Sequence, residues 1–331
     1  MTPIAVVIVN YNTREHLRAC LATVQTEEPT EVVVVDNASS DGSVEMVQAA
    51  YPWVRLYANR KNLGYGAAAN QAIASCNAPY VLLLNADTLL ESGGLRKLSA
   101  YLDQHLRAAI VGPRLVNSHG AQQRSWFPFP SRYVCHTWTT LPQLDAFCGR
   151  STGGRLIHYL FGFREQELGI GPDMRNRVVP WVLGAAVAVR REAFKAVGGF
   201  DESFFMYFEE TDLCYRLACA GWQVHFTPTT TIVHVGGVST TQRRAVMMLQ
   251  FFESEAQFYR RHYSKLLTMQ FKLVVGAVML ARIIVGRIRL YWRGDAARRV
   301  RLAENVFVGR SILAALWHLQ RYLDQAQRGN A

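Results

Sequence analysis

The first 112 residues alternate between short apolar runs and amphipathic stretches, and this alternation constrains the fold more than any other feature of the chain. The apolar runs are rich in β-branched residues and occupy residues 4–9, 31–36, 54–58, 80–84 and 108–112. Helical patterns lie between most of them, at residues 14–25, 43–50, 67–75 and 93–104. Continuous apolar strands separated by helices predict a mostly parallel sheet that is covered by helices on both faces.

The rest of the chain has a less regular pattern. Residues 117–179 are rich in turn signals, and we expect insertions over the sheet there. A strand that runs into a helix returns at residues 181–200, and a further helix and strand follow it up to residue 235. From Ser254 onward the pattern is helical. With 331 residues, half of them hydrophobic, the chain can bury the core of one large domain or two smaller ones.

Cysteine usage and the N-terminus both bear on the compartment. The six cysteines are scattered and include no Cys-x-x-Cys pair, which predicts neither a disulfide framework nor a zinc site and favours a reducing compartment. The opening residues, MTPIAVVIVNYN, show no basic leader and no cleavage site, so we expect no signal peptide.

The net charge of +11 belongs to the C-terminal segment alone. Residues 260–331 carry 14 lysines and arginines against three acidic residues, whereas residues 1–259 are neutral. Such asymmetry is typical of a segment with an anionic partner, either nucleic acid or membrane lipid.

Within this segment, residues 264–293 are hydrophobic but interrupted by charges. The longest charge-free run, residues 273–281, is too short to span a bilayer, which needs ~20 apolar residues. On a helical projection the basic side chains fall within an arc of roughly 160°, and apolar side chains gather opposite them. This pattern predicts a helix that lies in a membrane interface. The alternative is a helix packed on the protein core with solvated arginines.

Polar residues end three of the predicted strands. In chain order they are Asn10-Tyr11-Asn12, Asp36 and Asn85-Ala86-Asp87. One acid at such a position would be an ordinary helix cap. Because ligands of open α/β sheets bind at the carboxyl ends of the strands, three polar ends together predict a pocket at one edge of the sheet.

The stretch NLGYGAAAN, residues 62–70, has the spacing of a loose dinucleotide-binding fingerprint, and Asp87 lies about where a ribose-binding acid would fall. An NAD-dependent oxidoreductase is therefore an alternative. Against it, the glycines neither follow their strand directly nor form the first strand–helix turn. The oxidoreductase also leaves Asp36 and everything after residue 180 without a role.

Three acidic residues, Glu209, Glu210 and Asp212, follow an aromatic run at the predicted start of a helix. Such acids can simply complement the helix dipole. Crowded like charges can instead raise the pKa of one carboxyl and make it a proton acceptor, while the other two hold the geometry.

His234 ends an apolar strand and precedes Gly236-Gly237 and Arg243-Arg244. A lone histidine at such a position is more often a hydrogen-bonded structural residue than a ligand. Here the glycines let a loop come close to a ligand, and the two arginines are suited to phosphate groups.

Taken in this order, the motifs resemble the family 2 glycosyltransferases with the GT-A fold, especially bacterial rhamnosyltransferase-like members. The resemblance spans residues 3–262 and rests on VVIVNYN (6–12), VVVVDNASSDGS (32–43), NLGYGAAAN (62–70), LLLNADT (82–88), WVLGAAVAVRREAFKAVGGFDESFFMYFEETDLCYR (181–216) and VHVGGVS (233–239). It implies a Rossmann-like, mostly parallel sheet. Residues 1–115 would be the donor-binding half, 116–262 the acceptor-binding half and 263–331 a basic helical tail.

The resemblance also implies roles for individual residues. Asp36 would recognise the base of a nucleotide-sugar donor. The donor-binding residues would be Asn10, Tyr11, Asn12, Asp36, Gly64, Asn70, Asn85 and Asp87. Glu210 would be the catalytic base, flanked by Glu209 and Asp212. Trp181 and Gly184 would shape the acceptor side, and Arg243 and Arg244 would meet the diphosphate.

Asn85-Ala86-Asp87 takes the place of the Asp-x-Asp triplet that holds a divalent metal on the donor diphosphate. Because Asn is a weak ligand for a hard cation, the expected Mg²⁺ or Mn²⁺ depends on Asp87, with His234 as the second ligand. The metal would neutralise the leaving diphosphate, and Glu210 would deprotonate the acceptor hydroxyl in a single inverting displacement.

The basic tail fits this activity if the acceptor is a glycan on a polyprenyl diphosphate. We then expect a peripheral protein at the cytoplasmic face of the bacterial inner membrane, with residues 264–293 on anionic lipid and dTDP-rhamnose as the donor. A non-catalytic membrane or nucleic-acid-binding protein remains the other alternative. No nucleic-acid motif is visible, so we expect no nucleic-acid partner. The oligomeric state stays open.

Overall fold

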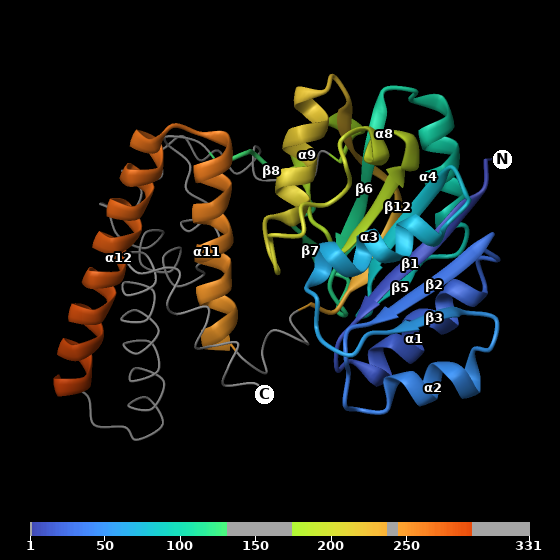
Figure 1. Cartoon of the computed structure of the whole chain (residues 1–331), viewed down its shortest axis with the longest axis horizontal. Coiled ribbons are helices and arrows are strands. Elements are labelled where there is room, and N and C mark those ends of the chain that lie inside the picture. Colours follow the sequence, from blue (N-terminus) through green and yellow to red (C-terminus); the bar gives the residue numbers. More distant parts are fainter. Residues whose placement is uncertain (1, 131–173, 237–243, 293–331) are drawn as a thin grey trace. The chain divides into compact units, whose positions relative to one another are not determined.

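The computed structural model describes residues 2–130, 174–236 and 244–292. The chain divides into two compact units, one made of residues 1–129 and 158–242 and the other of residues 130–157 and 243–331. Figure 1 shows the first unit as a sheet flanked by helices, and the described part of the second unit as a pair of long helices.

A ten-stranded sheet forms the frame of the first unit. Its main strands lie in the order β3-β2-β1-β4-β11-β6-β12-β5, with β7 beside β6 and β9 beside β12. The strands are β1 (Ile4–Asn10), β2 (Glu31–Asp36), β3 (Arg55–Ala58), β4 (Tyr80–Asn85), β5 (Thr88–Leu90), β6 (Ala108–Val116), β7 (Gln122–Gln123), β9 (Arg177–Val178), β11 (Ala186–Arg190) and β12 (Gln223–His234). Two short strands pair separately, β8 (Trp126–Phe127) and β10 (Trp181–Val182).

The sheet is mixed rather than uniformly parallel. The strands β3, β2, β1 and β4 pair in parallel, as the alternating pattern predicts. In contrast, β11 and β5 run antiparallel to their neighbours. The apolar pattern does not reveal this difference, because a strand buried on both faces reads the same in either direction.

Helices cover both faces of this sheet, which confirms the predicted layers. Ile4, Val6 and Ile8 of β1 point into one core, whereas Ala5 and Val7 point into the other, as the period of two along a strand requires. The first core is closed by α1 (Arg14–Gln25), α2 (Ser43–Ala50) and α4 (Gly94–Gln104). The second core is closed by α3 (Tyr65–Ser75), α8 (Arg191–Ala196) and α9 (Glu209–Cys219).

The described part of the second unit is a helical hairpin of α11 (Arg244–His262) and α12 (Lys265–Trp292). The rings of Tyr259 and Phe271 stack across it with their centroids 4.6 Å apart. The helical pattern predicted after Ser254 is confirmed up to Trp292, and residues 293–331 lie outside the described part. Of the helices described, none combines the length and apolarity needed to cross a bilayer.

The helix α12 is apolar on two opposite sides. One side is buried and consists of Thr268, Phe271, Val275, Met279 and Ile283. The other side is a stripe of large apolar residues that are 48–67% exposed: Leu266, Met269, Leu273, Leu280 and Ile284. We call this second side the α12 apolar stripe.

Candidate active site

The strand register brings the predicted polar strand ends together at one edge of the sheet. Asn10 pairs with Asp36 across β1 and β2, and Val9 pairs with Asn85 across β1 and β4. The carboxyl ends of three neighbouring strands therefore share one edge, as predicted from the sequence.

A hydrogen-bond network orders the part of this edge formed by β1 and β2. Asn10 Nδ2 donates to Asp36 Oδ2 at 2.7 Å, and the backbone N–H of Ser39 donates to Asp36 Oδ1 at 2.8 Å. Thr13 Oγ1 donates to Asn10 Oδ1 at 2.6 Å. Asn10 and Asp36 are 0% and 1% exposed, so their orientation is held by the protein before any ligand binds.

The two loops beside this network are tied to each other. Asn12, at φ 53°, donates its backbone N–H to the hydroxyl oxygen of Ser39, and its Oδ1 accepts the backbone N–H of Ser40. Tyr11 lies at the same edge and is half-buried.

Asp41 is a residue at this edge that the sequence reasoning missed. Its carboxylate accepts the backbone N–H of Arg14 at the start of α1 and that of Ser43 at the start of α2. Burial raises the pKa of Asp41, but the hydrogen bonds from Ser43 and Arg14 outweigh burial and lower it overall. An acid just before a predicted helix was the available signal.

Asp87 lies at the tip between β4 and β5, next to His234. Because His234 at the end of β12 pairs with Thr88 of β5, His234 Nε2 comes to 3.6 Å from Asp87 Oδ1. The backbone N–H of Gly236 donates to Asp87 Oδ2 at 3.0 Å. The side chain of Asp87 is 11% exposed and that of His234 is 13% exposed. His234 thus lies next to Asp87, and the role of the two as metal ligands stays a prediction.

Gln123, which the sequence did not single out, holds His234 in place. Its Nε2 donates to the backbone carbonyl of His234 at 2.8 Å, and its Oε1 lies 2.9 Å from His234 Nδ1. Since a carbonyl only accepts, the amide is oriented with Oε1 toward the ring, and Nδ1 donates to it. The Nε2 lone pair then faces Asp87. Burial lowers the pKa of His234 and the charge of Asp87 only partly opposes this, which favours the neutral imidazole.

A carboxylate beside a neutral imidazole fits two positions of a divalent-metal site. Among the described residues no cluster of three or more His, Cys, Asp or Glu side chains completes it. Asn85 ends β4 and donates its backbone N–H to Ala185 at 2.9 Å. Mg²⁺ and similar ions usually take one or two protein carboxylates and complete their shell with water and substrate phosphates, so the donor set suits an ion that arrives with a diphosphate.

The three predicted acids begin α9 but have different surroundings. Asp212 is fully buried and accepts Arg216 Nε at 2.7 Å, so it belongs to a structural ion pair. Burial raises the pKa of both Glu209 and Glu210, and the neighbouring Glu210 raises that of Glu209 further. The two residues before them, Tyr207 and Phe208, have φ values of 66° and 67°, a strained backbone of the kind found at functional sites.

Glu210 contacts the segment that leads into β11. A Cβ added to Gly184 would lie 3.2 Å from Glu210 Oε1, so only glycine leaves this carboxylate its full space. Trp181 is 6% exposed, with its ring stacked on Phe127 and its Nε1 donating to the Pro128 carbonyl. Of the two predicted acceptor-site residues, Gly184 therefore contacts Glu210, whereas Trp181 packs against Phe127.

The glycine loop before α3 contacts protein rather than open space. Gly64, at φ 85° and ψ 171°, lets the Phe205 carbonyl accept the backbone N–H of Tyr65 at 3.0 Å. Asn70 Nδ2 and Oδ1 both bond the backbone of Phe200 at 2.9 Å. This helix start is thus occupied by Phe205 and not open to a pyrophosphate, which disfavours the dinucleotide-binding alternative.

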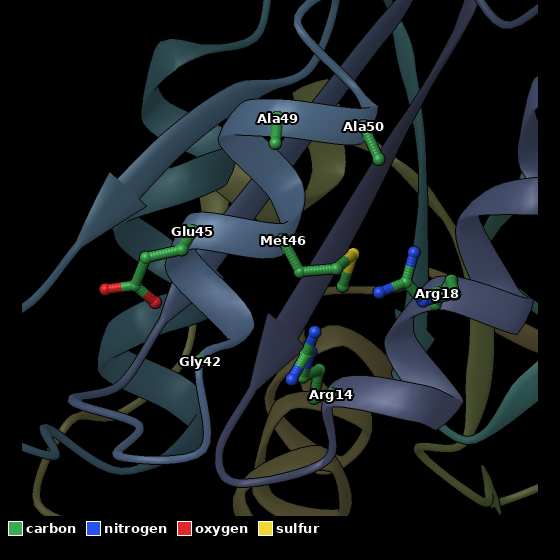
Figure 2. Close-up of a pocket in the computed structure, with 7 residues that line it drawn as sticks. All are labelled: Arg14, Arg18, Gly42, Glu45, Met46, Ala49 and Ala50. Atoms are coloured by element: carbon green, nitrogen blue, oxygen red, sulfur yellow. The ribbon is translucent and has the colours of Figure 1, made fainter.

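Two predicted contacts have no described side chain, and one hollow is lined by none of the predicted site residues. Arg243 is outside the described residues, and of Arg244 only its backbone at the start of α11 is described. A hollow of about 360 Å³ lies between α1 and α2. Figure 2 shows Arg14 and Arg18 on α1 and Met46 extending from α2 at this hollow. Both arginines lie 3.5 Å from Glu15, which offsets their charge.

Comparison with known proteins defines the class. Residues 5–166 match the family model described as Glycosyl transferase family 2, and residues 160–319 match Glycosyl transferase family group 2. The crystal structure of GalNAc-T7 with UDP, GalNAc and Mn²⁺ superposes with a TM-score of 0.51 at 16% identity, covering 71% of this chain and 44% of that one. The chain belongs to the family 2 glycosyltransferases and has a GT-A-like fold.

Within that family the chain is similar to bacterial rhamnosyltransferases. It is 32% identical over 250 residues to the N-acetylglucosaminyl-diphospho-decaprenol L-rhamnosyltransferase of Mycobacterium tuberculosis (strain ATCC 25618 / H37Rv), covering 71% of this chain and 76% of that protein. It is 23% identical over 242 residues to rhamnosyltransferase WbbL of Escherichia coli (strain K12), covering 69% and 82%. The oxidoreductase alternative is not favoured.

Proposed function

We propose that this glycosyltransferase moves L-rhamnose from dTDP-rhamnose to a hydroxyl of a polyprenyl-diphosphate-linked glycan, with inversion at the anomeric carbon, in cell-surface polysaccharide synthesis. Two of its relatives are named as rhamnosyltransferases, and the name of one includes a decaprenol diphosphate. The same type of donor and acceptor would suit the polar edge of this sheet.

One observation supports the proposal most directly. The antiparallel strand β11 places Ala185 against Asn85, two residues from Asp87, while the adjacent Gly184 contacts Glu210. The pairing of β4 with β11, which the hydrogen bond from Asn85 to Ala185 extends, thereby connects the segment of Asp87 and His234 to the segment that contacts Glu210. This is the arrangement that transfer from a diphosphate to a hydroxyl requires: a place for the leaving group beside a proton acceptor.

In the proposed reaction Glu210 accepts the proton of the acceptor hydroxyl. The acceptor oxygen forms a bond to the anomeric carbon, and the bond from that carbon to the donor phosphate breaks, with its electron pair going to the nucleoside diphosphate. The raised pKa of Glu210 makes its carboxylate a stronger base than an exposed glutamate. No enzyme nucleophile takes part, so the configuration inverts.

Asp87 and His234 would hold a Mg²⁺ or Mn²⁺ ion, and Gln123 would keep the imidazole oriented toward it. When bound, such an ion neutralises the charge that develops on the leaving diphosphate. Asn10 and Asp36, already ordered, would bind the base of the donor together with Tyr11 and Asn12.

We further propose that the second unit binds the cytoplasmic face of the inner membrane through the α12 apolar stripe. The basic residues predicted for this segment would meet anionic headgroups, while the stripe enters the acyl boundary. The exposure of Leu266, Leu273 and Ile284 supports this over a helix whose apolar face is buried on the core.

A transfer assay with dTDP-rhamnose and an N-acetylglucosaminyl-diphospho-polyprenol tests the activity. We expect Glu210→Gln to lower turnover by about 10²–10⁴-fold with an unchanged melting temperature. The matched control is Glu192→Gln, because Glu192 is an exposed glutamate on α8 and the chemical change is the same. A folded Glu210→Gln variant with near-normal turnover would remove Glu210 as the base. Full activity after complete chelation of divalent ions would contradict the metal requirement. The absence of product with dTDP-rhamnose would contradict the proposed donor.

A further inference from the structure

Glu209 and Glu210 are consecutive acids at the start of α9, and neither forms a salt bridge with a residue in the described part of the chain. Glu209 is 6% exposed, and Oε2 of each side chain is buried without a hydrogen-bond partner among the described residues. Arg216 donates through Nε to Asp212 and through Nη1 to the carbonyl of Val197, each at 2.7 Å, while its Nη2 is buried without a partner among the described residues. Its charge is not among the causes that act on the pKa of either glutamate. Two carboxylates in such surroundings do not both ionise near neutral pH, because each disfavours the charge of the other.

The groups that face the pair add no positive charge. Tyr65 comes from α3, and burial, followed by the charges of the two glutamates, raises the pKa of its phenol. Cys214 lies one turn along α9, and burial raises the pKa of its thiol. With Glu210, both side chains line a small enclosed cavity of about 10 Å³ between α3, α9 and the sheet. Phenol and thiol are therefore neutral where the enzyme works.

Backbone amides distinguish the two carboxyls. Gly184 lies against the carboxyl of Glu210, since a Cβ added there would be 3.2 Å from Oε1, and the backbone N–H groups of Glu210, Gly184 and Thr211 partly oppose the burial that raises the pKa of Glu210. On Glu209 only its own backbone N–H acts in this way. The pair is therefore built to carry its charge on Glu210 and a proton on Glu209.

We propose that Glu209 keeps a proton throughout the working pH range, so that the pair holds a single negative charge, on Glu210. This inference rests on the proposed role of Glu210 as the base. Glu209 acts through Glu210 as a positioning residue. As a neutral acid it adds no repulsion toward the donor diphosphate. After transfer both carboxyls are protonated, and Glu210 returns its proton to solvent before the next turnover.

The first test compares Glu209→Gln, a neutral isostere of protonated glutamate, with the unmodified enzyme. The acid limb of kcat/KM against pH reports the ionisation of Glu210 in the free enzyme. If Glu209 is neutral in the unmodified enzyme, the acid limb of kcat/KM lies at the same pH in the variant and in the unmodified enzyme. This holds even if the maximal kcat/KM of the two proteins differs. If Glu209 is charged, removing the charge moves the limb to lower pH by about one unit or more, and this result would overturn the proposal.

The second test needs no activity. Near pH 7 the infrared spectrum of the unmodified protein should contain a carbonyl band of a protonated carboxyl that Glu209→Gln lacks, whereas Glu192→Gln retains it. Identical spectra of the unmodified protein and Glu209→Gln would also overturn the proposal. Failure of the proposed function gives a different result: Glu210→Gln would turn over normally while the band of Glu209 persists.

Discussion

Asn12, Ala38, Tyr207 and Phe208 hold backbone angles that residues with a side chain rarely adopt, with φ between 53° and 67°. Each costs about 1–3 kcal/mol relative to a relaxed backbone. Asn12 and Ala38 flank the network around Asp36, and the other two directly precede the acids of α9. Four of the five non-glycine residues with positive φ in the described part of the chain therefore lie beside the residues that we propose bind the donor and accept the proton, and the fifth, Glu28, lies between α1 and β2.

At the scale of a single residue, Gln123 offers a test of the metal site. Gln123→Leu removes the acceptor of His234 Nδ1 and the donor to its carbonyl, so the imidazole loses its orientation. We expect the Mn²⁺ concentration for half-maximal transfer to rise about 10–100-fold.

Gln122→Leu is the matched control, because Gln122 Nε2 donates to Met174 Sδ instead. Equal Mn²⁺ requirements in the two variants would contradict a role of Gln123 at the metal.

Glu209 also predicts how stability depends on pH. Burial and the charge of Glu210 raise the pKa of Glu209 in the folded protein well above 4.5, its ordinary value. Below pH 4.5 the stability of the protein relative to Glu209→Gln is greatest. It falls as pH rises above 4.5, because Glu209 ionises in the unfolded chain before it ionises in the folded protein. The difference in unfolding free energy should shift in favour of the variant by up to about 1.4 kcal/mol per pH unit, until the raised pKa is reached. Denaturant unfolding from pH 5 to pH 8 measures it, and a constant difference would show an unperturbed Glu209.

At the scale of elements, the contact between α3 and the loop before α9 depends on Gly64. Its φ of 85° and ψ of 171° belong to a region that essentially only glycine occupies, and an added Cβ would lie 2.3 Å from the Phe205 carbonyl oxygen. Gly64→Ala should therefore lower the unfolding free energy by more than about 3 kcal/mol.

Gly120→Ala is the control for backbone conformation alone. Gly120 has a φ of 76°, but a Cβ there meets nothing within 4 Å. We expect it to cost about 1–2 kcal/mol. Thermal and denaturant unfolding measure the free energy of unfolding of both variants. If Gly64→Ala and Gly120→Ala lose the same amount, the contact with Phe205 does not constrain Gly64.

At the scale of the whole molecule, the α12 apolar stripe should decide membrane binding. Replacing Leu273 and Leu280 with Glu places two charges on a surface that is about half exposed, so folding should be retained while lipid binding is lost. Flotation with vesicles containing anionic lipid should recover the unmodified protein and leave the variant in the soluble fraction.

Leu106→Glu, at a site that is 73% exposed in the first unit, should float normally. Flotation of the double variant would reject the stripe as the lipid contact. A drop in molecular mass in solution without a change in flotation would instead make the stripe a contact between copies.

The order of apolar, amphipathic and polar stretches along the chain is enough to predict the layers of the fold and the types of side chain at its polar edge. The bounds predicted for α1 and α2 are those observed, because their apolar positions follow the helical period and Gly42 and Thr13 end the preceding loops. The polar ends of β1, β2 and β4 could be predicted to meet because parallel strands share one carboxyl edge. Asn10, Asp36 and Asp87 were found in this way.

The tertiary structure alone decided which of these groups act together. Asp87 and Gly236 are 149 residues apart in sequence, and they meet because β12 pairs antiparallel with β5. The resemblance implied that His234 lies near Asp87, but strand direction leaves no trace in a fully apolar run, so the antiparallel pairing of β12 with β5 and the hydrogen bonds of Gln123 to His234 could not be predicted. The sequence also could not assign a role to Asp212. An acid at the start of a helix can act as a proton acceptor or form an ion pair, and both have the same position in the sequence. The salt bridge of Arg216 to Asp212 makes Asp212 structural, whereas Glu209 and Glu210 form no salt bridge within the described residues.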